Sequence, residues 1–235
     1  YIFSTTNSGN VIVQATVGGG YGDIYGTDWK RTSNGKLVVD AQGRPLATSK
    51  KVYLGNYQPD WTGGVTNIFR YKKFTLNTLI DIRVGGKLFS GTDASMDASG
   101  VSDRTLKYRN GVTLDAVYNS GTPEKPVWTK NTSQITGQQY WGSVSKIASN
   151  YVYSQTFVML REVSFIYHLP KQLFKSNFIN SVSIGIVGRN LAFLYKKMKN
   201  FDPISSYSTS NYAQGVLYFT PPTTRSIGFN INVKF

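Results

Sequence analysis

The last nine residues of the chain, 227–235, alternate strictly in polarity. An apolar side chain stands at every odd position, and Gly, Asn or Lys stands at every even one. Because the side chains of a strand point alternately to opposite faces, this segment predicts a strand with one apolar and one polar face. Its length is about that of a tilted strand crossing a bilayer. The pattern indicates a wall between hydrocarbon and water or, equally, the edge strand of a soluble β-sandwich.

Further segments with the same two-residue period precede this one. The clearest is 74–84, which at about eleven residues exceeds the usual five or six of a globular strand. A short polar turn, Lys72-Lys73, comes before it, and Pro170 ends a later strand because proline cannot donate to a ladder. The predicted strands, of which the first is the weakest, are 11–17, 65–71, 74–84, 157–169, 182–189 and 227–235.

The connections between these strands differ in length. Long segments at 18–64, 85–150 and 191–222, rich in Gly, Ser, Thr, Asn and Pro, alternate with short ones. Such long irregular segments are unusual in a compact soluble domain, whereas outer-membrane barrels combine tight periplasmic turns with extended outer loops. We therefore expect an all-β fold: about six C-terminal strands of a large antiparallel transmembrane β-barrel with long extracellular loops. The short turns and Phe235 would be periplasmic.

Composition agrees with part of a larger membrane barrel. The 235 residues begin at Tyr1 without a signal peptide, and six strands cannot close a barrel, so we expect a piece of a longer protein. Cysteine is absent, which excludes disulfides and a Cys nucleophile. The formal charge of +14 is dispersed as single residues and pairs, which argues against a nucleic-acid partner. Acidic lipid headgroups or an anionic solute fit this charge better.

No set of residues suggests catalysis, a cofactor or a metal. His168 is the only histidine and stands on a predicted strand, so a Ser/His/Asp triad is not expected and the chain is not predicted to be an enzyme. Asp93 and Asp97 lack EF-hand spacing and are expected to cap or solvate a short helix. Asp81 and Arg83 share the polar face of their strand, which suggests an ion pair or part of a charged lumen wall.

An ordered series of motifs resembles the C-terminal quarter of the SusC/RagA-type TonB-linked outer-membrane importers. The resemblance covers most of the chain. Two features depart from the family pattern: Ile204 follows Asp-Pro where Glu is usual, and 115–126 differs in composition. The matching segments are Pro59–Asn67, Tyr71–Leu76, Gly85–Ser90, Thr105–Arg109, Phe157–Pro170, Gly188–Leu191, Phe201–Pro203 and Pro221–Arg225.

The resemblance implies a function and partners. Residues 1–235 would form the C-terminal part of a TonB-dependent receptor barrel, with the plug and the remaining strands outside this segment. Family members import oligosaccharides or oligopeptides across the bacterial outer membrane, with a SusD-like surface lipoprotein and energy from the TonB complex. Two alternatives stay open: a non-transporting barrel such as an adhesin, and a soluble carbohydrate-binding β-sandwich.

Two groups of residues are candidate sites. The first consists of aromatic residues in the expected outer loops, where rings stack on sugars or pack against peptides, or else form a loop core or an interface girdle: Trp128, Tyr140, Trp141, Tyr207 and Tyr212. The second is the apolar face of the terminal strand. By resemblance to outer-membrane barrels, this face contacts lipid, is read by the barrel assembly machinery and closes the barrel: Phe229, Ile231, Val233 and Phe235.

Overall fold

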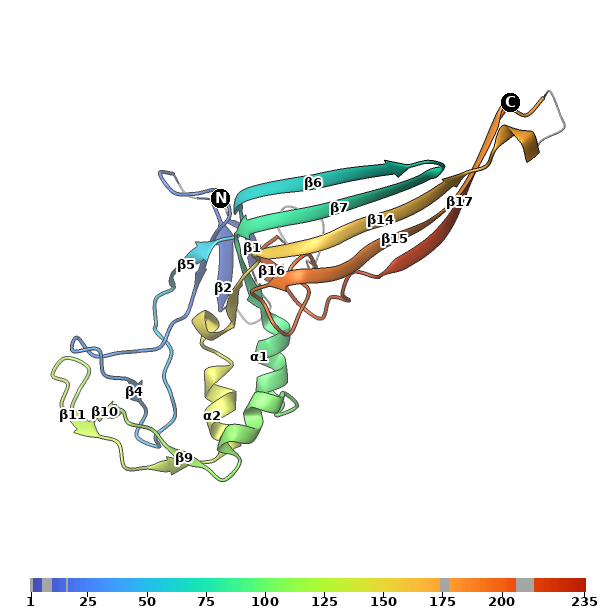
Figure 1. Ribbon diagram of the computed structural model, residues 1–235. Helices are drawn as coiled ribbons and strands as arrows, with labels where there is room; N and C mark the ends of the chain where they lie inside the picture. The colour runs from blue at the N-terminus through green and yellow to red at the C-terminus, as the bar shows by residue number, and fades with distance from the viewer. Residues whose placement is uncertain (1, 6–9, 16, 174–177, 206–213) are drawn as a thin grey trace. The chain divides into compact units, whose positions relative to one another are not determined.

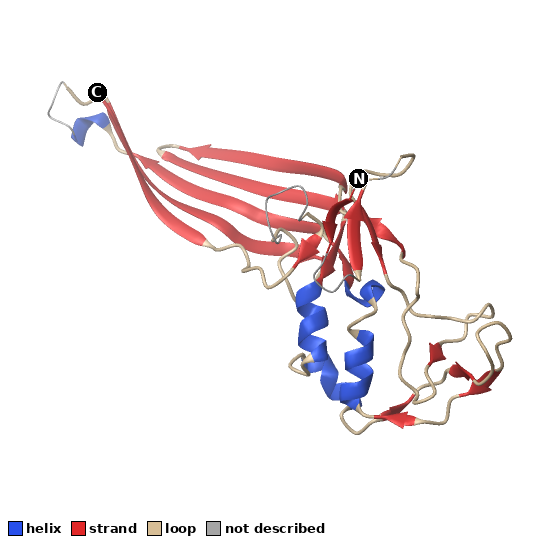
Figure 2. Ribbon diagram, turned by 180° about the vertical axis from the view of Figure 1, so that it is seen from behind, coloured by secondary structure: helices blue, strands red, loops and turns tan. Residues whose placement is uncertain are grey.

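The computed structural model divides the chain into two compact units. One, called here the loop unit, comprises 1–58, 86–153 and 206–220; the other, the sheet unit, comprises 59–85, 154–205 and 221–235. Figure 2 shows the helices and strands of both. The residues that the structure describes are 2–5, 10–15, 17–173, 178–205 and 214–235.

The sheet unit is a single antiparallel sheet of five long strands in the order β17-β15-β14-β7-β6 (Figure 1). The strands contain 9 to 16 residues, longer than the usual five or six and sufficient to cross a bilayer when tilted. A short 3₁₀ turn, η3 (Lys171–Leu173), follows the third strand. The strands are β6 (Pro59–Tyr71), β7 (Phe74–Gly85), β14 (Phe157–His168), β15 (Ser181–Lys196) and β17 (Ser226–Lys234).

Cross-strand register gathers apolar side chains on one face of this sheet. One row runs through all five strands, since each residue pairs with the next: Phe69, Leu76, Phe165, Ile186 and Phe229. A second row, two residues away, is Tyr71, Phe74, Tyr167, Ile184 and Ile231. Phe229 is 84% exposed. A face of this composition is uncovered in the sheet unit and suits contact with hydrocarbon.

The opposite face is polar and hydrogen-bonded across the strands. Asn77 Nδ2 donates to Ser164 Oγ at 3.0 Å, and His168 Nε2 lies 3.3 Å from Thr75 Oγ1. Arg189 Nε donates to Glu162 Oε2 at 2.9 Å. The single histidine therefore belongs to a polar strand face, as expected from the alternation, and the sheet separates an apolar side from a wet one.

The connections are sorted by end, as predicted. Lys72-Lys73 and the segment after His168 close one end of the sheet, where the chain also stops, whereas every segment of the loop unit leaves from the other end. The prediction that 11–17 forms a sixth strand of this sheet is wrong. Its residues form β2 (Val11–Gln14) in a separate sheet of the loop unit, where Val11 and Val13 are fully buried. The sheet thus has five strands.

Among its described residues, the loop unit contains four small sheets and four short helices, so the long segments are not irregular as the sequence suggested. In the described residues, no helix combines the length and apolarity needed to cross a membrane. The strands are β1 (Ile2–Thr5), β2, β3 (Asp23–Gly26) and β5 (Val52–Asn56); β4 (Val38–Val39), β10 (Val117–Asn119) and β11 (Trp128–Lys130); β9 (Val112–Thr113) and β12 (Gln134–Ile135); and β8 (Lys87–Ser90), β13 (Val152–Ser154) and β16 (Val216–Leu217).

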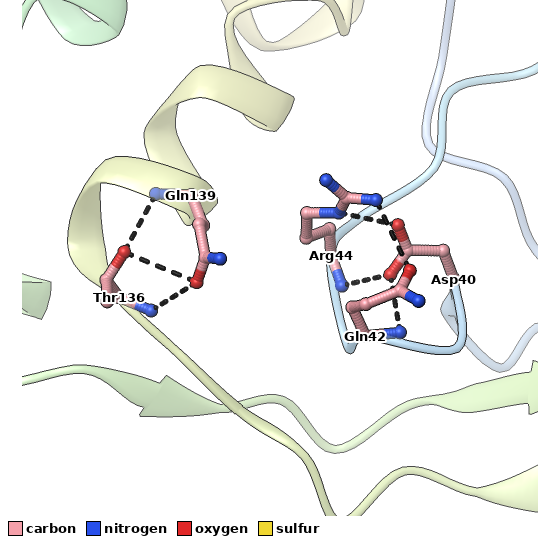
Figure 3. Close-up of polar contacts among 5 residues, drawn as sticks. All are labelled: Asp40, Gln42, Arg44, Thr136 and Gln139. Atoms are coloured by element: carbon pink, nitrogen blue, oxygen red, sulfur yellow. Dashed lines mark hydrogen bonds and ion pairs between the residues drawn. The ribbon is translucent and has the colours of Figure 1, made fainter.

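In the described residues, the loop unit has two α-helices that begin at side-chain caps and two 3₁₀ helices that do not. They are α1 (Gly91–Ala98), η1 (Asp103–Tyr108), α2 (Gly137–Val144) and η2 (Ala148–Tyr151). Ser90 Oγ accepts from Asp93 N at the start of α1, and Thr136 and Gln139 form a capping box at the start of α2 (Figure 3). A common core joins residues far apart in sequence, including Tyr57, Phe89, Trp141, Tyr151 and Val216.

Substitution of Phe229 by lysine tests the assignment of the apolar face to lipid. We expect Phe229→Lys to reduce the free energy of unfolding in a bilayer by about 2–4 kcal/mol, since a charge near mid-membrane must be desolvated. Unfolding of the full-length protein by denaturant in vesicles measures this. Asn230→Lys, on the opposite face, is the matched control and should change the stability by only about 0.5 kcal/mol. Equal stability of both variants would contradict the assignment.

Candidate functional site

One candidate site in the loop unit is an open cavity between α1, η1 and α2, called here the helix cavity. It has a volume of about 510 Å³, within the range of small-ligand sites. The end of α1, the 3₁₀ helix and the first turn of α2 contribute its walls. The lining residues are Asp97, Ala98, Ser99, Gly100, Thr105, Arg109, Thr136, Gly137, Gln138 and Trp141.

A buried charge pair forms one side of the helix cavity. The Asp97 side chain is fully buried and accepts from Arg104 Nε at 2.8 Å and from the Tyr151 hydroxyl at 2.8 Å. The Arg104 guanidinium lies over the rings of Tyr151 and Trp141, 5.0 Å and 5.6 Å from their centroids. Asp97 is therefore neutralised by Arg104 of η1, and its fully buried carboxylate neither caps nor solvates α1 as the sequence suggested.

Burial also changes the titration of the tyrosines beside this pair. Burial, followed by the charge of Asp97, raises the pKa of Tyr151 far above its ordinary value. Burial and the neighbouring Tyr108 raise the pKa of Tyr140 to about 12. Both phenols stay protonated at neutral pH, so they act here as hydrogen-bond donors and packing groups.

The other side of the helix cavity presents donors. Thr136 Oγ1 accepts from Gln139 N at 3.2 Å, which leaves the first N–H groups of α2, at Gly137 and Gln138, ahead of the helical ladder. Gly137 is required there, because a Cβ atom would lie 2.6 Å from the Tyr108 carbonyl oxygen. By contrast, the end of α1 is closed by its own backbone: Gly100, at φ +71°, donates to the Asp97 carbonyl at 3.1 Å.

A second open cavity, of about 400 Å³, lies beside Trp128 and is called here the Trp128 cavity. Trp128 is 41% exposed and shares this cavity with Lys30 and Asn119. Asp40 also lines it, but its carboxylate is held within a turn, where it accepts from Arg44 Nε at 2.6 Å (Figure 3). An exposed indole beside polar side chains suits an amphipathic ligand such as a sugar ring.

The predicted aromatic residues are thus divided between different surroundings. Trp141 is only 8% exposed and belongs to the core of the loop unit, while it also lines the helix cavity. Tyr140 packs on Trp141 and Tyr108, with ring centroids 5.0 Å and 4.6 Å away. Trp128 lines the other cavity. Tyr207 and Tyr212 lie outside the described residues. Arg109 has no local sequence signal that marks it as a cavity residue, and sequence reasoning missed it.

The terminal-strand candidates lie together at one edge of the sheet unit. Phe229, Ile231 and Val233 share the apolar face of β17, and the Phe235 ring lies 5.1 Å from that of Phe178. Strand β17 pairs on one side with β15, and in the described residues its other side is unpaired. An unpaired edge of this length is a surface for another strand.

Polar side-chain contacts that link three strands give a structural role to the Gly188–Leu191 motif. Arg161 occupies a bulge in β14 and forms an ion pair with Asp81 of β7, so the partner of Asp81 is not Arg83. Arg161 Nη1 also donates to Asn190 Oδ1 at 2.9 Å. Asn190, at φ +52°, donates in turn to the Thr224 carbonyl at 3.0 Å. Asn tolerates this left-handed conformation, which explains its use at the bulge.

Two further motifs contact each other. Asp202 Oδ2 accepts from Thr223 N at 2.8 Å and from Thr223 Oγ1 at 2.5 Å, and its Oδ1 accepts from Ile204 N at 2.9 Å. The Asp-Pro motif thereby fixes the segment that leads into β17. Only the backbone of Ile204 takes part, so this contact does not depend on the Glu that is usual there.

Comparison with known proteins agrees with this architecture. No family model matches the chain. Two curated proteins of Formosa agariphila are similar to it: TonB-dependent receptor P3, 27% identical over 207 residues and 86% of this chain, and TonB-dependent receptor P39, 25% identical over 222 residues and 91% of it. The chain spans only 19% of the length of each relative.

Solved structures show the same fold. The RagAB peptide transporter matches with a TM-score of 0.57 and 19% identity, over 99% of this chain and 24% of that one. The RagAB peptide importer in its closed-closed state gives a TM-score of 0.58 over 100% and 25%, again at 19% identity. These matches confirm the resemblance to the C-terminal portion of SusC/RagA-type TonB-linked proteins, together with the all-β fold and the outer-membrane location.

The raised pKa of Tyr151 predicts a pH-dependent loss of stability in the loop unit. Above pH ~10, the unfolded state loses a phenolic proton that the folded state retains, so the free energy of unfolding falls as pH rises, by up to about 1.4 kcal/mol per pH unit. Near-UV circular dichroism of the full-length protein, heated at pH 9 to 12, measures this. Tyr151→Phe should make the pH dependence shallower, and an unchanged slope would contradict the prediction.

Proposed function

We propose that the full protein imports oligomeric nutrients, glycan or peptide, across the bacterial outer membrane. In this proposal, residues 1–235 are the C-terminal part of the barrel and its outer loops, and the plug and the remaining strands come from another segment. The TonB complex supplies the energy through that segment, and a SusD-like lipoprotein assists at the surface. No enzymatic activity is proposed.

The observation that carries the proposal is the two-faced sheet with two unpaired edges. Strands β6 and β17 each have one neighbour in the described residues, and each is long enough to cross a bilayer. Backbone groups left unpaired in lipid cost several kcal/mol each, so further strands must complete such a wall. Barrels of the largest common class, with about 22 strands, hold a plugged lumen, which is what an energised importer requires.

The relatives support transport and suggest one substrate class. The solved structures are described as a peptide transporter and a peptide importer, whereas the curated relatives are described only as TonB-dependent receptors. Oligopeptides are therefore one candidate cargo. The exposed indole of Trp128 beside Lys30 and Asn119 suits a sugar as well, and we propose it as a contact for either oligomer.

The terminal strand supports a second part of the proposal, barrel assembly. We propose that the apolar face of β17 contacts outer-membrane lipid, that its free edge pairs with the first strand of the barrel, and that the assembly machinery reads this segment. The support is the exposure of Phe229, Ile231 and Phe235 on a strand that ends the chain segment. A soluble β-sandwich is disfavoured, because it would need a second layer over the apolar face.

Uptake measurements in the source bacterium test the transport proposal. We expect deletion of the gene to abolish accumulation of at least one component in a mixture of labelled oligopeptides and oligosaccharides. A protonophore should likewise abolish accumulation in the wild type while leaving surface binding intact, because TonB-driven import needs the proton gradient. Normal accumulation in the deletion strain would contradict the proposal. Surface binding without accumulation would instead favour the non-transporting barrel.

A further inference from the structure

The turn between β6 and β7 places a positive charge at the border of the apolar face of the sheet unit. We propose that Lys72 and three neighbouring rings bind an anionic phospholipid in the bilayer leaflet at this end of the sheet. The lysine binds the headgroup phosphate, and the rings contact the acyl chains. This inference goes beyond the proposed function, because it concerns the membrane and not the imported cargo.

The first support is a group of packed rings on the apolar face, called here the ring cluster: Phe74, Phe165 and Tyr167. The Phe74 centroid lies 5.4 Å from that of Phe165 and 4.9 Å from that of Tyr167. Phe74 and Phe165 are 40% and 47% exposed. Aromatic rings at the ends of membrane-spanning strands lie at the level of the lipid headgroups. The ring cluster therefore offers a lipid a fixed apolar surface just below its headgroup.

The second support is the position of the lysine ammonium. Lys72 Nζ lies 5.3 Å from the ring centroid of Tyr71, which pairs with Phe74 on the apolar face. The ammonium is thus next to the ring cluster. Lys72 is exposed, and among the described residues it forms no ion pair. A cation at the edge of the hydrocarbon region finds its counter-charge in the headgroup layer.

The third support is the backbone conformation of Lys72, which is independent of its charge. Its φ is +53°, in the left-handed region that is unfavourable for a side chain of this size. Gly and Asn adopt this conformation at lower cost and are the usual residues of a two-residue hairpin turn. Lysine therefore brings no conformational advantage here. Strained residues of this kind cluster at functional sites, which points to a role for the cationic side chain.

The fourth support is the balance of charge at this end of the sheet. Lys73 and Lys171 are also exposed there, whereas the acidic residues Asp81 and Glu162 already have arginine partners. A positive field favours a headgroup with a net negative charge over a zwitterionic one. Phosphatidylglycerol is therefore a better ligand than phosphatidylcholine. The segments that form this end of the sheet contain no Asp or Glu: 65–80, 163–188 and 226–235.

Quenching of a local fluorophore by brominated lipids tests the inference on the full-length protein in vesicles. Phe74→Trp keeps a ring in the ring cluster, and subtracting the emission of the unsubstituted protein isolates its signal. The vesicles contain equal amounts of phosphatidylglycerol and phosphatidylcholine, of which one or the other carries brominated acyl chains. We expect phosphatidylglycerol to bind at this site about fivefold more strongly. Equal quenching by the two lipids would overturn the proposal.

Variants in the Phe74→Trp background assign the preference to Lys72. Lys72→Asn removes the charge but suits the positive φ, so the turn should form at least as well as before. We expect this variant to reduce the preference for phosphatidylglycerol by at least about threefold. Lys72→Arg keeps the charge and should keep the preference. Lys36→Gln, which removes an exposed charge from the loop unit, is the matched control and should have no effect.

The same variants give a clear contrary result. A preference for phosphatidylglycerol that is as strong in Lys72→Asn as in the Phe74→Trp parent would overturn the assignment to this lysine. Unfolding by denaturant in the same vesicles shows whether each variant is folded before its quenching is compared. Because the measurement uses purified protein and lipid alone, its outcome is independent of whether the protein imports peptides or glycans.

Discussion

The architecture depends on one constraint, that every backbone N–H and C=O group within a bilayer must be paired. The sheet unit meets it internally through four antiparallel strand pairs, and its two outer strands leave groups that only further strands can satisfy. The same constraint makes strand length, register and the alternation of side chains interdependent. A slip by one residue would turn the row that contains Phe165 and Phe229 toward the polar side.

On the polar face of the sheet, side-chain contacts also fix the register of the strands. The bulge at Arg161 interrupts regular pairing, yet its side chain joins Asp81 and Asn190 on the two flanking strands, and Asn190 reaches the segment before β17. Asp202 holds the same segment through Thr223. The motifs that carried the family resemblance thus hold the strands of the sheet unit together. This explains why they identify the fold rather than the cargo.

The five long strands could be predicted from the sequence, because the two-residue alternation of polarity is a local signal and because these strands are longer than those of globular proteins. Sequence reasoning failed at 11–17, since alternating valines look the same in a membrane wall and in a small buried sheet such as that of β2. It also missed the compact loop unit, whose core joins Tyr57, Phe89 and Val216 without any local period. Aromatic composition identified Trp141 but not Arg109, because a cavity is a property of tertiary packing.

The composition of the loop unit has a consequence for the order of folding. Strand β16 pairs in parallel with β8, and Val216 lies in the core, so the last long connection of the chain completes a unit that began before β6. Contacts of such wide sequence separation form late and slowly. A polypeptide secreted from its N-terminus would therefore expose the apolar residues of this unit until nearly all of the segment had been delivered, and would need protection against aggregation during that interval.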